Sequence, residues 1–140
     1  MGLRIKRGAT VYMDTNALIY LTEGDPALKA SIEGFISEID RADSRIVTSE
    51  LAYTELLVIP FRTSNAKLIE AYDLLLRTLV LPLPLGREEL LLAAKLRATS
   101  LKLRTPDALH LATAILADTD VFVTGDRGID VPAPMKKFCL

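Results

Sequence analysis

The segment TPDALHLATAILADTDVFVTGD, residues 105–126, joins a helical pattern to a strand pattern, and both patterns are almost entirely apolar. Its first part predicts a helix that is apolar nearly all the way round, with Thr105 as the N-cap and Pro106 at the first helical position. Its second part, DVFVTGD at 120–126, predicts a strand that ends in a glycine turn. A helix buried on every side has no ordinary use for a carboxylate, yet Asp107 lies in its first turn. The segment therefore predicts a buried α/β core and marks one unusual acid.

The rest of the chain alternates between the same two patterns. Strands are predicted at 10–14 (TVYMD), 45–49 (RIVTS) and 79–85 (LVLPLPL), with one more short strand in the final MKKFCL. Helical spacing is found at 16–21, 26–42, 50–61, 65–78 and 87–103. Because each strand is nearly all apolar, we expect a parallel sheet covered by helices on both faces. The predicted fold is one three-layer α/β/α domain, residues 1–140, whose central and mostly parallel sheet has four or five strands.

Composition narrows the classes of protein that need to be considered. The chain has 140 residues, of which 50% are hydrophobic and 25% charged, as in one globular domain with a sizeable core. The net charge of −1 provides no global basic field for nucleic acid, so a bound polyanion would need local cations or metal ions. No apolar run approaches the roughly 20 residues of a membrane helix, and the basic start MGLRIKRGAT lacks the apolar stretch of a signal peptide. A single cysteine, Cys139, forms no internal disulfide and indicates a reducing, cytoplasmic setting without membrane attachment.

Four acids occupy positions where an apolar residue or a plain turn is more usual. In parallel α/β folds, ligands bind beyond the carboxyl ends of the strands, where Asp14 ends the first strand and Asp126 follows the strand of the opening segment. Glu55 interrupts the apolar stripe of its helix, and Asp107 lies at a helix N-terminus, which favours an anion. Taken alone, each has an ordinary explanation as a cap, a turn former, a dipole complement or a salt-bridged side chain.

The coincidence of the four acids is what indicates a site. Carboxylates that converge at one end of a sheet repel one another and lose hydration unless cations compensate them. Hard, oxygen-preferring divalent ions such as Mg²⁺ or Mn²⁺ are the natural partners of such clusters. Acids, a divalent metal and a cleft together favour phosphoryl chemistry.

These residues lie in four motifs that resemble, in order, the motif series of PIN-domain proteins. The motifs are VYMDTNALIY (11–20), TSELAYTELL (48–57), TPDALHLATA (105–114) and VFVTGDRG (121–128). PIN-domain proteins are metal-dependent ribonucleases best known as the VapC toxins of bacterial and archaeal toxin–antitoxin pairs. The resemblance covers about residues 10 to 130 and rests on all four motifs at the family's spacing.

The resemblance implies a role for each matching residue. The catalytic and metal-binding acids would be Asp14, Glu55, Asp107 and Asp126, and the supporting residues would be Thr15, Asn16 and Thr124. Asp14 and Asp107 are expected to bind Mg²⁺ or Mn²⁺ directly, Glu55 to orient water or a second metal, and Asp126 to hold a second or weaker metal. The implied reaction is hydrolysis of an RNA phosphodiester, and the implied partners are an RNA substrate, a small antitoxin and a second copy in a homodimer.

Other polar residues near the motifs leave alternatives open. His110 shares a helix face with Asp107 and could contact phosphate or support an acid, although a buried histidine at such a position is more often a core residue. Ser49 is expected to cap its helix, Glu50 to be solvated, and Arg127 to meet an RNA phosphate or to remain a surface arginine.

Three other functions are compatible with parts of this pattern. One is RNA processing outside a toxin pair, and another is a non-catalytic module that keeps the PIN fold, although all four acids are present here. The third is a haloacid dehalogenase phosphatase, which would pair Asp126 with Asp130 but leaves Glu55 and Asp107 unused and lacks a suitably placed lysine. Dinucleotide or ATP binding has no support, because neither GxGxxG nor GxxxxGK[ST] occurs.

Overall fold

The structure, a computed structural model, describes residues 4–140 and contains a five-stranded sheet with the order β3-β2-β1-β4-β5. Every neighbouring pair of strands is parallel. The strands are β1 (Thr10–Met13), β2 (Arg45–Ser49), β3 (Val80–Leu83), β4 (Val121–Thr124) and β5 (Lys136–Cys139). The predicted parallel sheet is confirmed, and the C-terminal segment supplies its fifth strand. The expectation that MGLRIKRGAT is no signal peptide rests partly on residues 1–3, which lie outside the described range.

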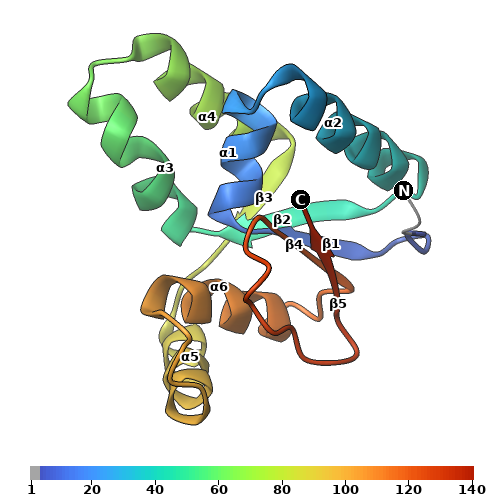
Figure 1. The fold of residues 1–140 in the computed structure, drawn as a ribbon, viewed down its shortest axis with the longest axis vertical. Coiled ribbons are helices and arrows are strands. Elements are labelled where there is room, and N and C mark those ends of the chain that lie inside the picture. Colours follow the sequence, from blue (N-terminus) through green and yellow to red (C-terminus); the bar gives the residue numbers. More distant parts are fainter. Residues whose placement is uncertain (1–3) are drawn as a thin grey trace.

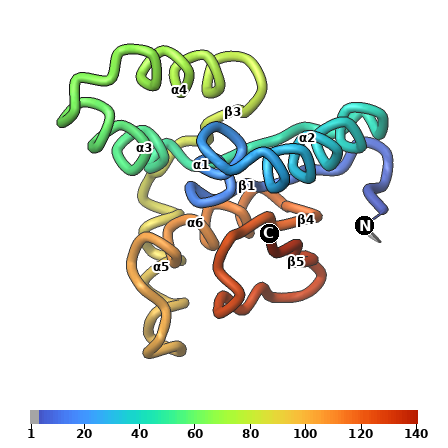
Figure 2. Tube along the Cα trace, turned by 45° about the horizontal axis from the view of Figure 1, so that its top comes forward, coloured from blue at the N-terminus to red at the C-terminus, as the bar shows by residue number. Residues whose placement is uncertain are grey.

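Helices cover both faces of this sheet. They are α1 (Thr15–Glu23), α2 (Pro26–Arg41), α3 (Leu51–Arg62), α4 (Ala66–Thr78), α5 (Arg87–Thr99) and α6 (Thr105–Leu116). Helices α1 to α4 lie on one side of the sheet, and α5 and α6 lie on the other (Figure 1, Figure 2). The chain therefore has the predicted three-layer α/β/α architecture. Within residues 4–140, no helix combines the length and the apolar character that a membrane crossing requires.

The two layers bury alternate side chains of the same strands. Val11 and Met13 of β1 belong to the cluster formed with α1 to α4, whereas Tyr12 packs with Phe122 of β4 and Leu111 of α6. The three β1 side chains are completely buried. A strand that is buried on both faces reads as a continuous apolar run, which is why the sequence pattern identified it.

Helix boundaries differ from the prediction where the start of a helix depends on backbone geometry. The predicted N-cap Thr105 is wrong by one position, because the first hydrogen bond of α6 runs from the amide of Ala108 to the carbonyl of Arg104. Arg104 is thus the N-cap, without a capping side-chain bond, and Pro106 is the second helical residue. Helix α5 ends at Thr99, four residues before its predicted end.

Helix α3 shows two related differences. It begins at Leu51, so Glu50 rather than Ser49 is the N-cap, although the Ser49 hydroxyl still accepts a hydrogen bond from the amide of Leu51 at 3.1 Å. The helix contains Pro60 and continues to Arg62, one residue beyond its predicted end at residue 61.

The sheet topology brings together the ends of the chain segments that carry the motifs. Helices α1 and α3 start directly after β1 and β2, and a short turn follows β4. Since all the strands are parallel, these connections lie together at the carboxyl ends of the strands, where α6 also begins (Figure 1). Strand β3 is an edge strand, as its Pro82 predicted.

Candidate functional site

A cavity of about 210 Å³ lies at the carboxyl end of β1. Its lining consists of Asp14, Thr15, Asn16, Ile19, Glu55, Asp107 and His110. Three of the four acids predicted from the sequence therefore reach one cavity, from the β1–α1 junction, from α3 and from α6. The parallel order of the strands and the two-sided helix layers account for this convergence of distant motifs.

Asp14 is the most deeply buried of these acids, with 5% of its surface exposed. It is the N-cap of α1, and its Oδ1 accepts a hydrogen bond from the amide of Ala17 at 3.0 Å. Burial raises the pKa of Asp14, and the nearby charge of Asp107 raises it further, whereas the Thr124 hydroxyl and the Ala17 amide oppose this rise. The Asp14 carboxylate is thus fixed in position, but its negative charge is only partly compensated.

Asp107 lies half-buried in the first turn of α6. Burial raises the pKa of Asp107, and the charges of Asp126 and Glu55 raise it too. Arg104, at the N-cap of the same helix, opposes this rise. Arg104 is exposed and was not singled out from the sequence, although its place three residues before an acid in a helix N-terminus was the available signal.

Asp126 does not line the cavity. It is exposed, its Oδ1 accepts a hydrogen bond from the amide of Gly128 at 2.8 Å, and its own amide donates to the Thr124 hydroxyl at 3.0 Å. Its charge nevertheless raises the pKa of Asp107. The structure therefore locates Asp126 in a turn beside the three cavity acids, with the fully buried Thr124 holding that turn.

Glu55 is fixed by two side chains that share one of its oxygens. Its Oε1 accepts a hydrogen bond from the Thr15 hydroxyl at 2.7 Å and lies 2.6 Å from Nε2 of His110. Burial raises the pKa of Glu55, but its bonds with His110 and Thr15 more than offset this and leave the pKa below its ordinary value. Glu55 is therefore ionised at neutral pH, and Thr15 supports it directly.

His110 is buried, with 3% of its surface exposed, and both of its ring nitrogens have partners. Its Nδ1 lies 2.6 Å from the hydroxyl of Tyr12. The structure thus makes His110 both a satisfied core residue and a partner of an acid. The sequence pattern identified Tyr12 only as part of an apolar strand. A tyrosine in a strand whose two faces are both buried needs a hydrogen-bond partner for its hydroxyl, and that need was the missed signal.

The remaining predicted residues are more loosely tied to the site. Asn16 lines the cavity and is exposed, with no side-chain hydrogen bond among residues 4–140. Glu50 is exposed, as predicted. Arg127 is also exposed, and its carbonyl oxygen accepts a hydrogen bond from Lys137 Nζ at 3.0 Å.

The chemistry of the cavity fits a hard divalent cation, with one qualification from its geometry. Within the part of the chain that the structure describes, no group of three or more His, Cys, Asp or Glu side chains is arranged to hold a metal ion. Glu55 is hydrogen-bonded to His110 and Thr15, and Asp126 lies outside the lining. Two carboxylates remain, Asp14 and Asp107, and Mg²⁺ commonly binds through one or two carboxylates while keeping several waters. The raised pKa of each indicates excess negative charge that a cation would relieve.

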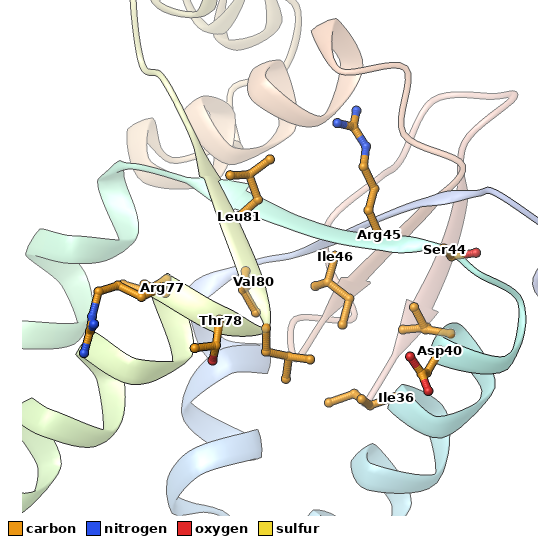
Figure 3. A pocket seen from close by; sticks show the side chains of 12 residues that line it. Ile36, Asp40, Ser44, Arg45, Ile46, Arg77, Thr78, Val80 and Leu81 are labelled. Carbon is orange, nitrogen blue, oxygen red and sulfur yellow. The ribbon is translucent and has the colours of Figure 1, made fainter.

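A second hollow of about 320 Å³ differs in its chemistry. It lies at the amino ends of β2 and β3, against the C-terminal parts of α2 and α4 (Figure 3). Its lining is largely aliphatic and includes one acid, Asp40, and two arginines, Arg45 and Arg77. It lacks the paired carboxylates that the smaller cavity at the opposite end of the strands contains.

Comparison with known families agrees with this geometry. The family model described as PIN domain matches residues 11–133. The chain belongs to the PIN domain family. Membership excludes the haloacid dehalogenase interpretation and places the protein among chains with a nuclease fold. The comparison with curated proteins gives no match.

Several solved structures share the fold of this PIN domain. The fold matches FitAcB from Neisseria gonorrhoeae with a TM-score of 0.64 and 19% identity, over 91% of this chain and 96% of that one. It matches VapBC2 from Rickettsia felis, bound to a DNA fragment from its promoter, with a TM-score of 0.66 and 17% identity over 91% and 97% of the chains. It matches VapBC-1 from nontypeable Haemophilus influenzae with a TM-score of 0.66 and 24% identity over 84% and 87%. At these identities the likeness establishes a shared fold.

Proposed function

We propose that this PIN domain is an endoribonuclease that uses Mg²⁺ or Mn²⁺ to hydrolyse RNA phosphodiester bonds. The observation that carries the proposal is the convergence of Asp14, Glu55 and Asp107 on one cavity at the carboxyl end of the sheet. Two of these carboxylates carry raised pKa values, as expected where a divalent cation is the missing compensation.

Each acid has a distinct role in the proposed reaction. Asp14 and Asp107 would hold the metal ion, and Asp126 would contribute to a second or weaker metal site from the adjacent turn. A bound divalent ion would supply a more acidic water and would withdraw charge from the scissile phosphate. Glu55 is ionised and fixed by Thr15 and His110, so it is suited to orient the attacking water. In-line attack leaves a 5′-phosphate and a 3′-hydroxyl.

The supporting residues act on the positions of these acids. Thr15 donates to Glu55, and Thr124 accepts from the backbone of the turn that carries Asp126. Such partners typically alter metal affinity or activity by roughly 10- to 100-fold when they are removed. Asn16 offers an exposed amide at the rim, and the exposed Arg104 and Arg127 are candidate contacts for RNA phosphates.

We also propose that the protein is the toxin of a toxin–antitoxin pair. The solved structures with this fold include a toxin–antitoxin complex from Klebsiella pneumoniae, with a TM-score of 0.60 and 22% identity over 90% of this chain and 98% of that one. In this proposal a small antitoxin restrains the nuclease, and two copies of the PIN domain form a homodimer. An unrestrained ribonuclease in the cytoplasm harms its host, so a dedicated inhibitor is expected.

The nuclease proposal is tested with purified protein and defined RNAs. Single-stranded or loop RNA should be cut in Mg²⁺ and left intact in EDTA, because flanking bases can be read only where they are unstacked. Asp14→Ala should abolish cleavage and any growth arrest on expression, whereas Glu50→Gln, an exposed acid outside the cavity, should cut like wild type. Undiminished cleavage by Asp14→Ala would point to a contaminating nuclease or to another mechanism.

Two alternatives lead to different results in the same experiments. A non-toxin PIN nuclease for RNA processing would cleave RNA without arresting growth and without a neighbouring gene for a small DNA-binding protein. A non-catalytic PIN module would bind RNA or protein but leave RNA uncut in both Mg²⁺ and Mn²⁺.

A further inference from the structure

A chain of hydrogen bonds crosses the interior from the centre of the sheet to the candidate active site. It runs from the Tyr12 hydroxyl to Nδ1 of His110 over 2.6 Å, and from Nε2 of His110 to Oε1 of Glu55 over 2.6 Å. Thr15 joins it at the far end, with its hydroxyl 2.7 Å from the same oxygen of Glu55 and 3.1 Å from Nε2. Tyr12 is completely buried and His110 almost so, whereas Glu55 lines the cavity.

The ionised Glu55 fixes one proton of this series of hydrogen bonds. An ionised carboxylate only accepts hydrogen bonds, so Nε2 of His110 must donate to Glu55 and must carry a proton. Nδ1 of the same ring lies 2.6 Å from the Tyr12 hydroxyl, and the tautomer of the ring decides which of the two donates. Burial raises the pKa of Tyr12 well above its ordinary value, so the hydroxyl keeps its proton. Each of these groups therefore has a hydrogen-bond partner.

Packing holds the same rings in place. The ring of Tyr12 stacks on Phe122 of the neighbouring strand at 5.2 Å between centroids, with 5° between the planes. It meets His110 edge-on at 5.8 Å and 72°. Strands β1 and β4 are paired in the middle of the sheet, so the Tyr12 side chain starts from a fixed backbone position. Because His110 is hydrogen-bonded to both Tyr12 and Glu55, it can fix the position of Glu55 as well.

The consequence for Glu55 is an asymmetric carboxylate. Both side-chain donors bind Oε1, and Oε2 has no protein donor among residues 4–140. If His110 served only the core, an apolar side chain would fill the space without placing polar atoms in a low-dielectric interior. Its second partner is instead a carboxylate of the cavity, which links the buried chain to the site.

We propose that Tyr12 and His110 are positioning residues, which hold Glu55 by Oε1 so that Oε2 remains available in the cavity. The expected effect on RNA cleavage rests on the proposed nuclease function. The hydrogen-bonded arrangement of Tyr12, His110 and Glu55 does not depend on that function. His110 acts through Glu55 and does not contact the substrate, and Tyr12 acts through His110.

The hydrogen-bonded arrangement of Tyr12, His110 and Glu55 can be tested without measuring activity and without adding metal. Because the protein contains one histidine, untagged ¹⁵N-labelled protein gives a single set of imidazole signals in long-range ¹H–¹⁵N spectra. We expect a ring protonated at Nε2 in wild type and a shifted Nδ1 signal in Tyr12→Phe, which keeps the stacked ring but loses the hydroxyl. An Nε2 without a proton in wild type, or an unchanged Nδ1 signal in Tyr12→Phe, would overturn the proposal.

The effect on function is tested by a double-mutant cycle in which the rate of RNA cleavage is measured. His110→Leu should lower kcat by roughly 10- to 100-fold with KM changed less than about threefold, and His110→Gln, whose amide can donate from the same place, should recover most of the loss. Combined with Glu55→Gln, His110→Leu should cause no further loss, because both act through one carboxylate. Leu111→Met, a volume-conserving change at the adjacent buried position, is the matched control for core disturbance and should leave kcat unchanged.

The outcomes separate the inference from the function on which it rests. Losses that multiply in the double variant would make His110 a merely structural residue and overturn the inference, while the nuclease assignment stands. Cleavage by Asp14→Asn equal to wild type would overturn the nuclease assignment, and the imidazole spectra would still decide the arrangement. If His110→Leu does not fold, the same cycle with Tyr12→Phe replaces it.

Discussion

Asp14 and Asp107 reach one cavity from opposite faces of the sheet, and the charge of Asp107 raises the pKa of Asp14. Asp14 belongs to the junction of β1 with α1, whereas Asp107 begins the helix on the other face. Each carboxylate is stabilised locally, by the Ala17 amide in one case and by the helix N-terminus in the other. Local stabilisation does not remove their mutual repulsion, so the metal-free site is kept at a cost in free energy.

The first prediction concerns metal affinity. Asp14→Asn and Asp107→Asn should each weaken Mn²⁺ binding by roughly tenfold or more, because each removes the charge of one of the two cavity carboxylates whose pKa is raised. Calorimetric titration of the purified proteins measures this directly. Glu50→Gln, which removes an exposed acid outside the cavity, should bind like wild type. Equal Mn²⁺ affinity in wild type and both Asn variants would show that the metal site has been assigned to the wrong residues.

The second prediction concerns the stability of the metal-free protein. The pKa of Asp14 is raised on folding, so its contribution to the free energy of unfolding is present at low pH and is lost as the pH rises through the folded-state pKa. In EDTA at neutral pH, Asp14→Asn should therefore melt no lower than wild type, since Asn also caps α1. The difference in Tm, variant minus wild type, should shrink as the pH is lowered and Asp14 takes up its proton.

Asp14→Ala is the control for this prediction. It removes the same charge and also the oxygen that accepts from Ala17, so it should be less stable than Asp14→Asn by about 1 kcal/mol. An Asn variant that melts well below wild type at neutral pH in EDTA would mean that the ionised carboxylate stabilises the fold, contrary to the raised pKa.

The sequence predicted the elements that depend on periodic burial and missed those that depend on contacts between distant segments. Tyr12 and Phe122 lie in apolar runs whose burial on both faces follows from the pattern alone. The bond between Tyr12 and His110 joins residues far apart in the chain and has no local signature. The hydrogen bond between Glu55 and His110 likewise joins residues far apart in the chain.

Some predicted helix boundaries were wrong for a different reason. The start of α6 is set by the carbonyl of Arg104, which accepts a hydrogen bond from the amide of Ala108. The side chain of Arg104 forms no capping hydrogen bond and is not of a type that predicts a cap. The start of α1 is different, because Asp14 accepts from Ala17 and its residue type is typical of an N-cap. Caps formed by side chains can be predicted from sequence, whereas caps formed by backbone alone cannot.

The third prediction concerns Gly125, in the turn between β4 and Asp126. A Cβ at this position would lie 2.6 Å from Cε2 of Tyr20 and 3.3 Å from Cβ of Asn16, so Gly125→Ala requires the Tyr20 ring, α1 or the turn to move. We expect a loss of about 1–3 kcal/mol in the free energy of unfolding and a lower affinity for metal, because Asp126 follows directly. Chemical denaturation and Mn²⁺ titration measure the two effects.

Tyr20→Leu is the compensating change for this variant. It removes the ring that the new Cβ would meet, so the double variant should regain part of the stability lost by Gly125→Ala. Strictly additive losses would show that contact with Tyr20 is not the reason for glycine at this position.

The fourth prediction concerns the surface on which the proposed antitoxin would bind. Leu56 of α3 belongs to the core, with 3% of its surface exposed, so it offers little surface to a partner. The most exposed apolar residues of α3 are Ile59, at 64%, and Phe61, at 61%. Ile59 lies one turn beyond Glu55 on the same helix, so a bound segment can cover it and still reach the acidic cavity.

A partner that combines an apolar segment with an arginine suits this arrangement. The planar guanidinium can bind a carboxylate at two points, so an arginine in the cavity would pair with Glu55, Asp107 or Asp126 and compete with metal. Ile59→Glu should abolish co-purification with the antitoxin, while the RNase activity remains and the free energy of unfolding changes by no more than about 0.5 kcal/mol, as is usual at exposed positions. In the partner, replacing C-terminal arginines with alanine should restore RNA cleavage at concentrations at which the unaltered partner inhibits. A partner that stays bound to Ile59→Glu would assign the interface to another face, and one that binds wild type without reducing cleavage would refute inhibition through the cavity.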